Sequence, residues 1–270
     1  MEFKHLTIKK ILDVASYGNH GASYPIKVIA SDDEVWLLKT TYNNTLVAEG
    51  CCHVFPEILV YLIADYTKIK PYLQEMALME VTANSILMAE SALEQDTEQN
   101  EQALRNLRNS VGTNFAVKWL DDADKPADLA QLSNSLVHAT ILTDAILMNR
   151  DRSKSNPNII HSVSGSETKV IDFGLGLKEL TLCEQAKTKG VAIAFHHAKT
   201  CIFEKDYLFY EKVNEVSFPK KRPTKDDIVS AMKYIPTTWA SDIVKEAVAE
   251  LIAYRFNNKS IVQEKQNASL

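Results

Sequence analysis

Two short stretches of the sequence hold polar residues whose types and spacing suit chemistry on a phosphate group. The first, NRDRSKSNPN at residues 149–158, places Asp151 five residues before Asn156. The second, KVIDFGLGL at residues 169–177, places Asp172 after a short apolar strand and before a Phe-Gly pair. A carboxylate can orient an attacking hydroxyl group, and carboxylate and amide oxygens are ligands that Mg²⁺ prefers. The stretches predict phosphoryl transfer from a nucleotide, with Asp151 as the catalytic carboxylate and Asn156 and Asp172 as metal ligands.

A lysine and a glutamate earlier in the chain fit the same chemistry. Lys39 ends the predicted strand EVWLLK, and Glu49 opens the helix that is expected next. Protein kinases use a strand lysine on the nucleotide phosphates and pair it with a carboxylate of the following helix. A lone lysine at a strand end is usually just solvated, but the downstream motifs favour a phosphate contact. We therefore expect Lys39 and Glu49 to form the ion pair of a nucleotide site.

The loop SYGNHGAS, at residues 16–23, precedes the first clear hairpin and carries Gly18 and Gly21. It matches neither G-x-G-x-x-G nor the Walker A pattern. Its glycines could let backbone N–H groups approach the phosphates, and we expect the loop to lie over them. An ordinary hairpin turn is the alternative reading.

Hydrophobic periodicity predicts strands first and mostly helices later. Residues 24–31 alternate like a strand, and the strong apolar spacing of residues 127–148 predicts a central, buried helix. The other expected elements are strands at 34–39, 75–81, 112–118 and 168–173, and helices at 45–55, 56–69, 90–110, 224–236 and 240–256. The expected fold class is α+β with two lobes, an antiparallel sheet plus helix in the N-lobe and a mainly helical C-lobe; that these lobes form a protein-kinase-like fold is what the family resemblance described below implies. The expected division is 1–118 for the N-lobe and 119–270 for the C-lobe, with an adenine-contacting hinge near 116–122.

Composition narrows the class of protein. The net charge of −5 does not indicate a general nucleic-acid-binding surface, and the basic run at 219–225 is expected to be a surface linker. The four cysteines form no C-x-x-C pair, so neither a zinc framework nor a secreted disulfide scaffold is indicated. The adjacent His196 and His197 are expected to be structural or cleft residues rather than metal ligands. No apolar stretch approaches about 18 residues and no cleavable leader is evident, so we expect a cytoplasmic protein without a membrane contact.

The chain resembles the HipA-like kinases, specifically the short single-chain proteins with a HipA-like kinase domain. The NRDRxxxNPN run followed by IDFG is the most specific part of this likeness. The other segments that carry it, over most of residues 15–256, are GNHGASYPIKVIASDDEVWLLK, VAEG, GTNFAVKW, the apolar residues before NRDR, and IPTTW with AYRF in the tail.

The resemblance implies a serine/threonine protein kinase that uses ATP and Mg²⁺. By that likeness Asp151 is the catalytic aspartate, Asn156 and Asp172 hold the metal, and Lys39 contacts ATP, while Arg152 is expected to pair with a carboxylate or phosphate. The family implies a protein substrate, a toxin–antitoxin setting with an antitoxin partner, and control by phosphorylation of the phosphate-binding loop. Ser23, or Ser16, would be the site of that autophosphorylation, although both also suit ordinary turn positions.

The residues of the predicted site do not determine which molecule accepts the phosphate. The same site chemistry serves a kinase for a small molecule or a lipid headgroup, because the metal and lysine act on the nucleotide. A non-catalytic, kinase-like binding module is the third reading. An intact set of Asp151, Asn156 and Asp172 argues against it, because a module that only binds does not need Asp151.

Overall fold

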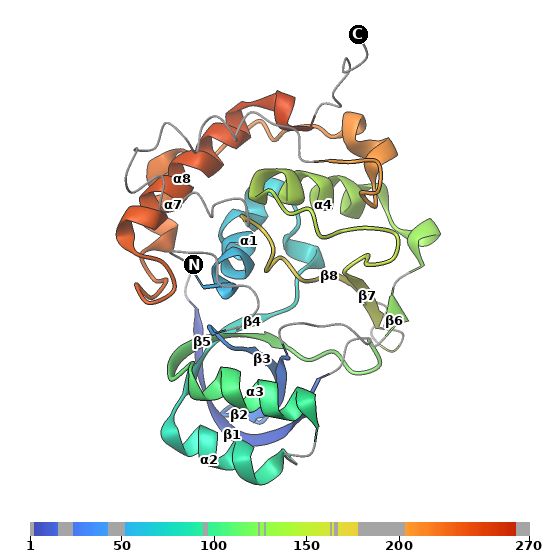
Figure 1. Cartoon of the computed structure of the whole chain (residues 1–270). Coiled ribbons are helices and arrows are strands. Elements are labelled where there is room, and N and C mark those ends of the chain that lie inside the picture. Colours follow the sequence, from blue (N-terminus) through green and yellow to red (C-terminus); the bar gives the residue numbers. More distant parts are fainter. Residues whose placement is uncertain are drawn as a thin grey trace.

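The computed structural model shows a mixed structure in which a sheet with two helices forms one end of the molecule and most of the other helices form the opposite end (Figure 1). It describes residues 3–15, 24–42, 52–93, 97–123, 125–126, 128–162, 164, 167–177 and 203–262. Within these residues, no helix is long and apolar enough to cross a membrane.

The sheet closes into a barrel with the strand order β1-β2-β3-β5-β4. The strands are β1 (Lys4–Val14), β2 (Ile26–Ala30), β3 (Val35–Lys39), β4 (Met76–Val81) and β5 (Gly112–Lys118). The expected hairpin of β2 and β3 is confirmed, with Val28 opposite Trp36. The buried faces of the strands fill the barrel with apolar side chains, which alternate along β2 as the period of a strand requires.

The prediction of an antiparallel sheet is wrong for one pair of strands, because β1 runs parallel to β4. The cause lies in the length and bending of β1, which has 11 residues. Its first part, Lys4–Thr7, pairs with β4, whereas Ile8–Val14 pairs with β2 through two register shifts. Such irregularities bend a strand and increase its twist, so one strand can border both neighbours and close the barrel.

Two helices inserted between β4 and β5 cover the outside of the barrel near β1 (Figure 1). They are α2 (Ala83–Ala92) and α3 (Glu98–Arg108), where the sequence predicted one helix over 90–110. Thr82 and Thr97 cap them, each accepting a bond from a backbone N–H of the first turn. The cap at Thr97 starts a new helix within the predicted segment, which therefore contains the end of α2 and the whole of α3.

The remaining helices share a second, larger apolar core. They are α1 (Val54–Thr67), α4 (Asn134–Leu147), α7 (Lys225–Met232) and α8 (Asp242–Asn257). The expected burial of α4 is confirmed, but the helix begins at Asn134 because Ser133 accepts a bond from the Leu136 N–H. At the start of α7, Thr224 and Asp227 form a capping box, in which each side chain bonds to the backbone N–H of the other residue.

Short elements connect these helices. A three-stranded sheet is formed by β6 (Lys125–Pro126), β7 (Ile159–Ser162) and β8 (Glu167–Val170), in that order. The 3₁₀ turns are η1 (Lys70–Tyr72), η2 (Leu129–Gln131), η4 (Tyr210–Glu215) and η5 (Lys259–Val262). The hairpin of β7 and β8 joins the two motifs of the sequence, since residues 149–158 precede β7 and residues 171–177 follow β8.

Candidate active site

The loop after α4 holds Asp151 between two asparagines. The helix ends at Leu147, and the next residue, Met148, has a φ of 57° that turns the chain out of the helical path. The Nδ2 atoms of Asn156 and Asn158 donate to Asp151 Oδ2 at 3.2 and 3.1 Å, and both also donate to the Asp151 backbone oxygen. The five-residue spacing seen in the sequence therefore brings an amide and a carboxylate into direct contact.

The hairpin of β7 and β8 brings Asp172 back to the same loop. Asn158 lies just before β7 and Asp172 just after β8, and the Ile171 N–H donates to the Asn158 oxygen at 2.9 Å. Asn158 and Asp172 have φ values of 49° and 58°, in the left-handed region that few residues other than glycine adopt. Asn and Asp tolerate this conformation best, and such backbone strain clusters at functional sites.

The carboxylates of Asp151 and Asp172 are close enough for the charge of one to change the pKa of the other. Burial raises the pKa of Asp151, and the negative charge of Asp172 raises it further. The bonds from Asn158 and Asn156 act in the opposite direction but do not cancel this increase. The arrangement suits a carboxylate that must accept a proton, because its basicity is above that of an ordinary aspartate.

Lys39 lies at the end of β3 and forms an ion pair with Glu57 of α1. The side chains are 12% and 6% exposed, so the pair is largely removed from water. Burial alone would lower the pKa of Lys39, but the charges of Glu57 and Asp172 raise it above its ordinary value. Lys39 is therefore a cation at neutral pH.

Gly174 lies close to Asp172, to Glu57 of the Lys39–Glu57 ion pair and to the start of α1. A Cβ atom placed on Gly174 would lie 3.6 Å from Asp172 Oδ1, 3.6 Å from Glu57 Oε1 and 3.6 Å from the backbone oxygen of His53. The start of α1 thus packs directly against the Asp-Phe-Gly segment. Lys39, Asp151, Asn156 and Asp172, predicted from separate parts of the sequence, lie in one cluster.

Glu57 and His53 belong to this cluster but were missed by the sequence reasoning. His53 is the residue before α1 and is 6% exposed. Burial, together with the nearby charge of Lys39, lowers the pKa of His53 to about 4, so its ring is neutral at neutral pH. Neither ring nitrogen has a hydrogen-bond partner of good geometry within the described residues, and the nearby backbone of Thr41 raises the pKa of His53 too little to offset burial. Pro56 was the available signal, because proline favours the first turn of a helix and so marks Glu57 as an acidic residue at a helix start.

Other predicted residues lie outside the described part of the chain. They are Gly18, Gly21, Ser16 and Ser23 of the glycine-containing loop, Glu49, and the pair His196 and His197. Their expected roles stay predictions. For Lys39, the carboxylate placed in contact by the structure is Glu57.

The prediction that Arg152 pairs with a carboxylate is confirmed. Its Nε donates to Asp144 Oδ2 at 2.8 Å, and both side chains are fully buried. Trp119, in the expected hinge, follows β5 directly, and its backbone N–H donates to the Val35 oxygen at 2.9 Å. Lys27 Nζ lies 4.3 Å from the centre of the Trp119 ring.

The donor set fits Mg²⁺ better than a transition metal. Among the described residues, no group of three or more His, Cys, Asp or Glu side chains could hold a metal ion by itself. Asp172 and Asn156 instead offer one charged and one neutral oxygen beside a second carboxylate. This set suits Mg²⁺, which keeps several waters and takes further ligands from nucleotide phosphates.

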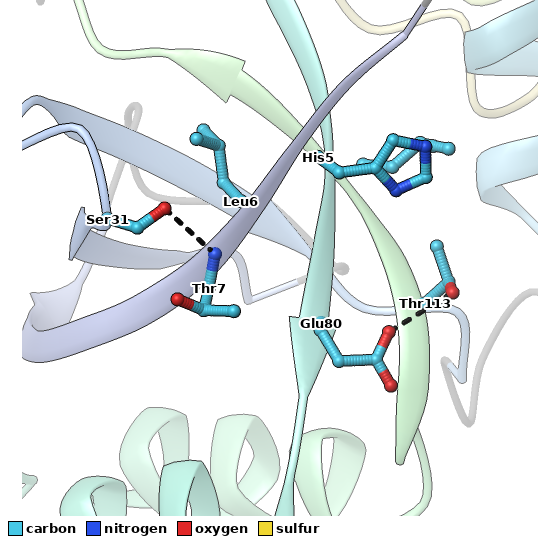
Figure 2. A pocket seen from close by; sticks show the side chains of 7 residues that line it. His5, Leu6, Thr7, Ser31, Glu80 and Thr113 are labelled. Atoms are coloured by element: carbon cyan, nitrogen blue, oxygen red, sulfur yellow. Dashed lines mark hydrogen bonds between the residues drawn. The ribbon is translucent and has the colours of Figure 1, made fainter.

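A small hollow on the barrel lies apart from these residues. It lies between β1, β4 and β5 (Figure 2). Its volume is about 150 Å³. Thr7 N–H donates to Ser31 Oγ, and Thr113 Oγ1 donates to Glu80 Oε2, both at 3.2 Å. These bonds already satisfy polar groups of the hollow, and none of the predicted site residues lines it.

Comparison with known proteins gives a kinase-like fold. No protein-family model matches the sequence, and no curated protein matches it. The crystal structure of a Helicobacter pylori proinflammatory kinase, CtkA, is similar with a TM-score of 0.52 and 13% identity, covering 93% of this chain and 95% of that chain. A crystal structure of the Golgi casein kinase aligns with a TM-score of 0.48 and 8% identity, covering 98% of this chain and 74% of that chain. The likeness to CtkA over nearly the whole of both chains shows that this protein has the fold of a kinase.

Proposed function

We propose that this protein is an ATP- and Mg²⁺-dependent kinase of the HipA-like type that phosphorylates serine or threonine of a protein. The observation that carries the proposal is the meeting of Lys39, Asp151, Asn156 and Asp172, from three separate places in the sequence, within a kinase-like fold. Residues 1–118 form the N-lobe in this proposal and residues 119–270 the C-lobe. The glycine-containing loop, with Gly18, Gly21 and Ser23, would close over the nucleotide.

The residues divide the work as follows. Lys39, held by Glu57, binds the phosphates of ATP. Asp172 and Asn156 would hold Mg²⁺, and Asn156 would use its amide oxygen, because its amide nitrogen donates to Asp151. The ion neutralises phosphate charge when it is bound.

Asp151 orients the acceptor and takes its proton. The hydroxyl oxygen of the acceptor forms a bond to the γ-phosphorus as the bond from that phosphorus to the β,γ-bridging oxygen breaks. ADP leaves, and the hydroxyl proton passes to the carboxylate of Asp151. The raised pKa of Asp151 favours this transfer, because a more basic carboxylate is the better acceptor.

Phosphate transfer by the purified full chain tests the proposal. The wild type should transfer the γ-phosphate to itself or to a lysate protein, and Asp151→Ala and Asp172→Ala should each abolish transfer. Asp65→Asn is the matched control, because Asp65 is an exposed aspartate on α1 that pairs with Lys70. Its activity should equal that of the wild type.

The acceptor is identified by two parallel measurements. Phosphoproteomics of cells that express the wild type or Asp151→Ala should reveal serine and threonine sites that depend on Asp151. If only small metabolites or lipids gain phosphate, the protein-kinase proposal is wrong and the small-molecule alternative holds. If the wild type transfers no phosphate and its cellular effect survives Asp151→Ala, the chain is a non-catalytic module. The proposed cytoplasmic location and antitoxin partner are tested by fractionation and by growth with and without co-expressed candidates.

A further inference from the structure

Arg152 is a fully buried cation that touches both motifs of the site. Its Nη1 donates to the backbone oxygens of Pro157 and Asn158 at 3.2 and 2.7 Å, and its Nη2 donates to that of Ile171 at 3.1 Å. Its Cζ atom lies 4.7 Å from the centre of the Phe173 ring. The planar guanidinium therefore connects the loop after α4 with the segment after β8.

The residues that Arg152 contacts are close in sequence to Asp151 and Asp172. Asp151 directly precedes Arg152, whereas Asp172 lies between Ile171 and Phe173, both of which Arg152 contacts. One rigid group thus holds the backbone of the loop that carries Asp151, the backbone oxygen just before Asp172 and the side chain just after it. The fork geometry of arginine fixes directions as well as distances, which a lysine cannot do.

Asp144 of α4 holds Arg152 in this orientation. Its Oδ2 accepts from Arg152 Nε at 2.8 Å and from the Tyr207 hydroxyl at 2.8 Å, and its Oδ1 accepts from Asn149 Nδ2 at 2.9 Å. Asp144 is fully buried, so losing any of these donors leaves a desolvated carboxylate less well satisfied.

Tyr207 brings a distant part of the chain into the network. It pairs with Ser153 in an isolated β-bridge, and the adjacent Leu208 N–H donates to the Arg152 oxygen at 3.0 Å. Its ring packs against that of Phe203, with centres 4.2 Å apart. The segment from Phe203 onward is thereby attached to the loop that carries Asp151.

We propose that Arg152 is a positioning residue that sets the separation of Asp151 and Asp172, and that the Tyr207 hydroxyl, acting through Asp144, sets the orientation of Arg152. The attachment of the segment after Phe203 then governs how well the site is assembled. The proposal rests on the proposed kinase function for its effect on rate, but the mechanical link can be tested without it.

The test compares Tyr207→Phe with Phe203→Leu in the full chain. Tyr207→Phe removes one hydroxyl and keeps the ring, whereas Phe203→Leu weakens packing in the same segment and leaves the hydrogen bonds of Asp144 in place. Tyr207→Phe should lower kcat by about 10- to 100-fold and raise the Mg²⁺ concentration needed for half-maximal rate, with little change in KM for ATP. Phe203→Leu should lower the Tm at least as much while changing kcat by less than about threefold. Arg152→Lys, which keeps the charge and loses the fork, should reproduce the kinetic effect of Tyr207→Phe.

Hydrogen–deuterium exchange gives a readout that needs no activity. Tyr207→Phe should speed exchange at residues 151–158 and 171–174 together, and Phe203→Leu should not produce this joint change. Unchanged exchange in either segment, or equal kinetic losses in Tyr207→Phe and Phe203→Leu, would overturn the positioning role. A wild type that transfers no phosphate but shows the joint change would refute the kinase function and leave the mechanical link standing.

Discussion

The ion pair of Lys39 and Glu57 gives a prediction that separates two readings of the site. The sequence pattern favours Glu49 as the partner of Lys39, whereas the contact in the structure is made by Glu57. We expect Glu57→Gln, which keeps the shape of the side chain and removes its charge, to lower the free energy of unfolding. Glu49→Gln is the matched control and should have little effect.

The size of the effect follows from burial. Removing one partner of a buried ion pair generally costs about 3–5 kcal/mol, because the other charge stays behind without compensation. Asp172 also raises the pKa of Lys39 and remains in the variant, so we expect a loss near the lower end, about 3 kcal/mol. In a double-mutant cycle with Lys39→Met, the coupling energy should be about 2–3 kcal/mol.

Urea unfolding of the four proteins of the cycle measures this coupling. An equivalent cycle on Lys9 and Asp33 provides the control, since this ion pair spans 2.7 Å but has side chains 45% and 79% exposed. Exposed pairs contribute about 0.2–1 kcal/mol. The reasoning is refuted if the Lys39–Glu57 coupling is no larger than that of the exposed pair, or if Glu49→Gln couples to Lys39 more strongly than Glu57→Gln does.

Three further predictions concern the loop, the Asp-Phe-Gly segment and the start of α7. Asn158→Gly suits the positive φ at this position but removes a bond that lowers the pKa of Asp151, so the acidic limb of the pH–kcat profile should move to higher pH; no shift or a downward shift contradicts this. Gly176→Ala should destabilise the fold by about 1–3 kcal/mol in urea unfolding, because its Cβ would lie 2.9 Å from a backbone oxygen, whereas Gly174→Ala meets only ordinary contacts and should cost less. Bonds from the capping residue lower the pKa of Asp227 below 3.8, so its ionised form stabilises the fold above about pH 4 and this contribution is lost as the pH falls through the lowered pKa; unfolding measured from pH 7 to 2 should show the wild type losing stability relative to Asp227→Asn in that window.

Local patterns predicted the parts of the site that depend on short-range structure. A hairpin of two short strands forces its two ends together, so Asp172 had to return to the loop that carries Asp151. The Asp151–Asn156 contact follows in the same way from a tight turn of a few residues. Lys39 could be assigned because it ends a short apolar strand that pairs with the alternating strand β2. In each of these cases the geometry is decided within a short stretch of sequence.

Features that depend on tertiary packing could not be predicted from local sequence patterns. The contact between Lys39 and Glu57 depends on where α1 begins and on how it packs beside β3, and the local sequence pattern fixes neither. The parallel pairing of β1 with β4 joins residues about seventy positions apart, as between Lys4 and Ala77. It also requires a bend in β1 for which the sequence of the strand gives no signal. The buried position of His53 likewise results from the packing of the start of α1 on the Asp-Phe-Gly segment.

The buried charges of this protein are best explained by geometry rather than by stability. Burying an ion pair costs desolvation energy that the attraction of the charges often fails to recover, so apolar side chains in the same places would stabilise the fold at least as well. Yet one buried pair, Lys39 with Glu57, connects the barrel to α1, and another, Arg152 with Asp144, connects the loop after α4 to that helix. Asp172 lies between them, because its charge acts on Lys39 and its chain neighbours contact Arg152. Hydrogen bonds between charged groups specify direction and distance, which apolar packing does not. Such pairs are therefore expected where two parts of a fold must be held in a fixed arrangement around a functional group.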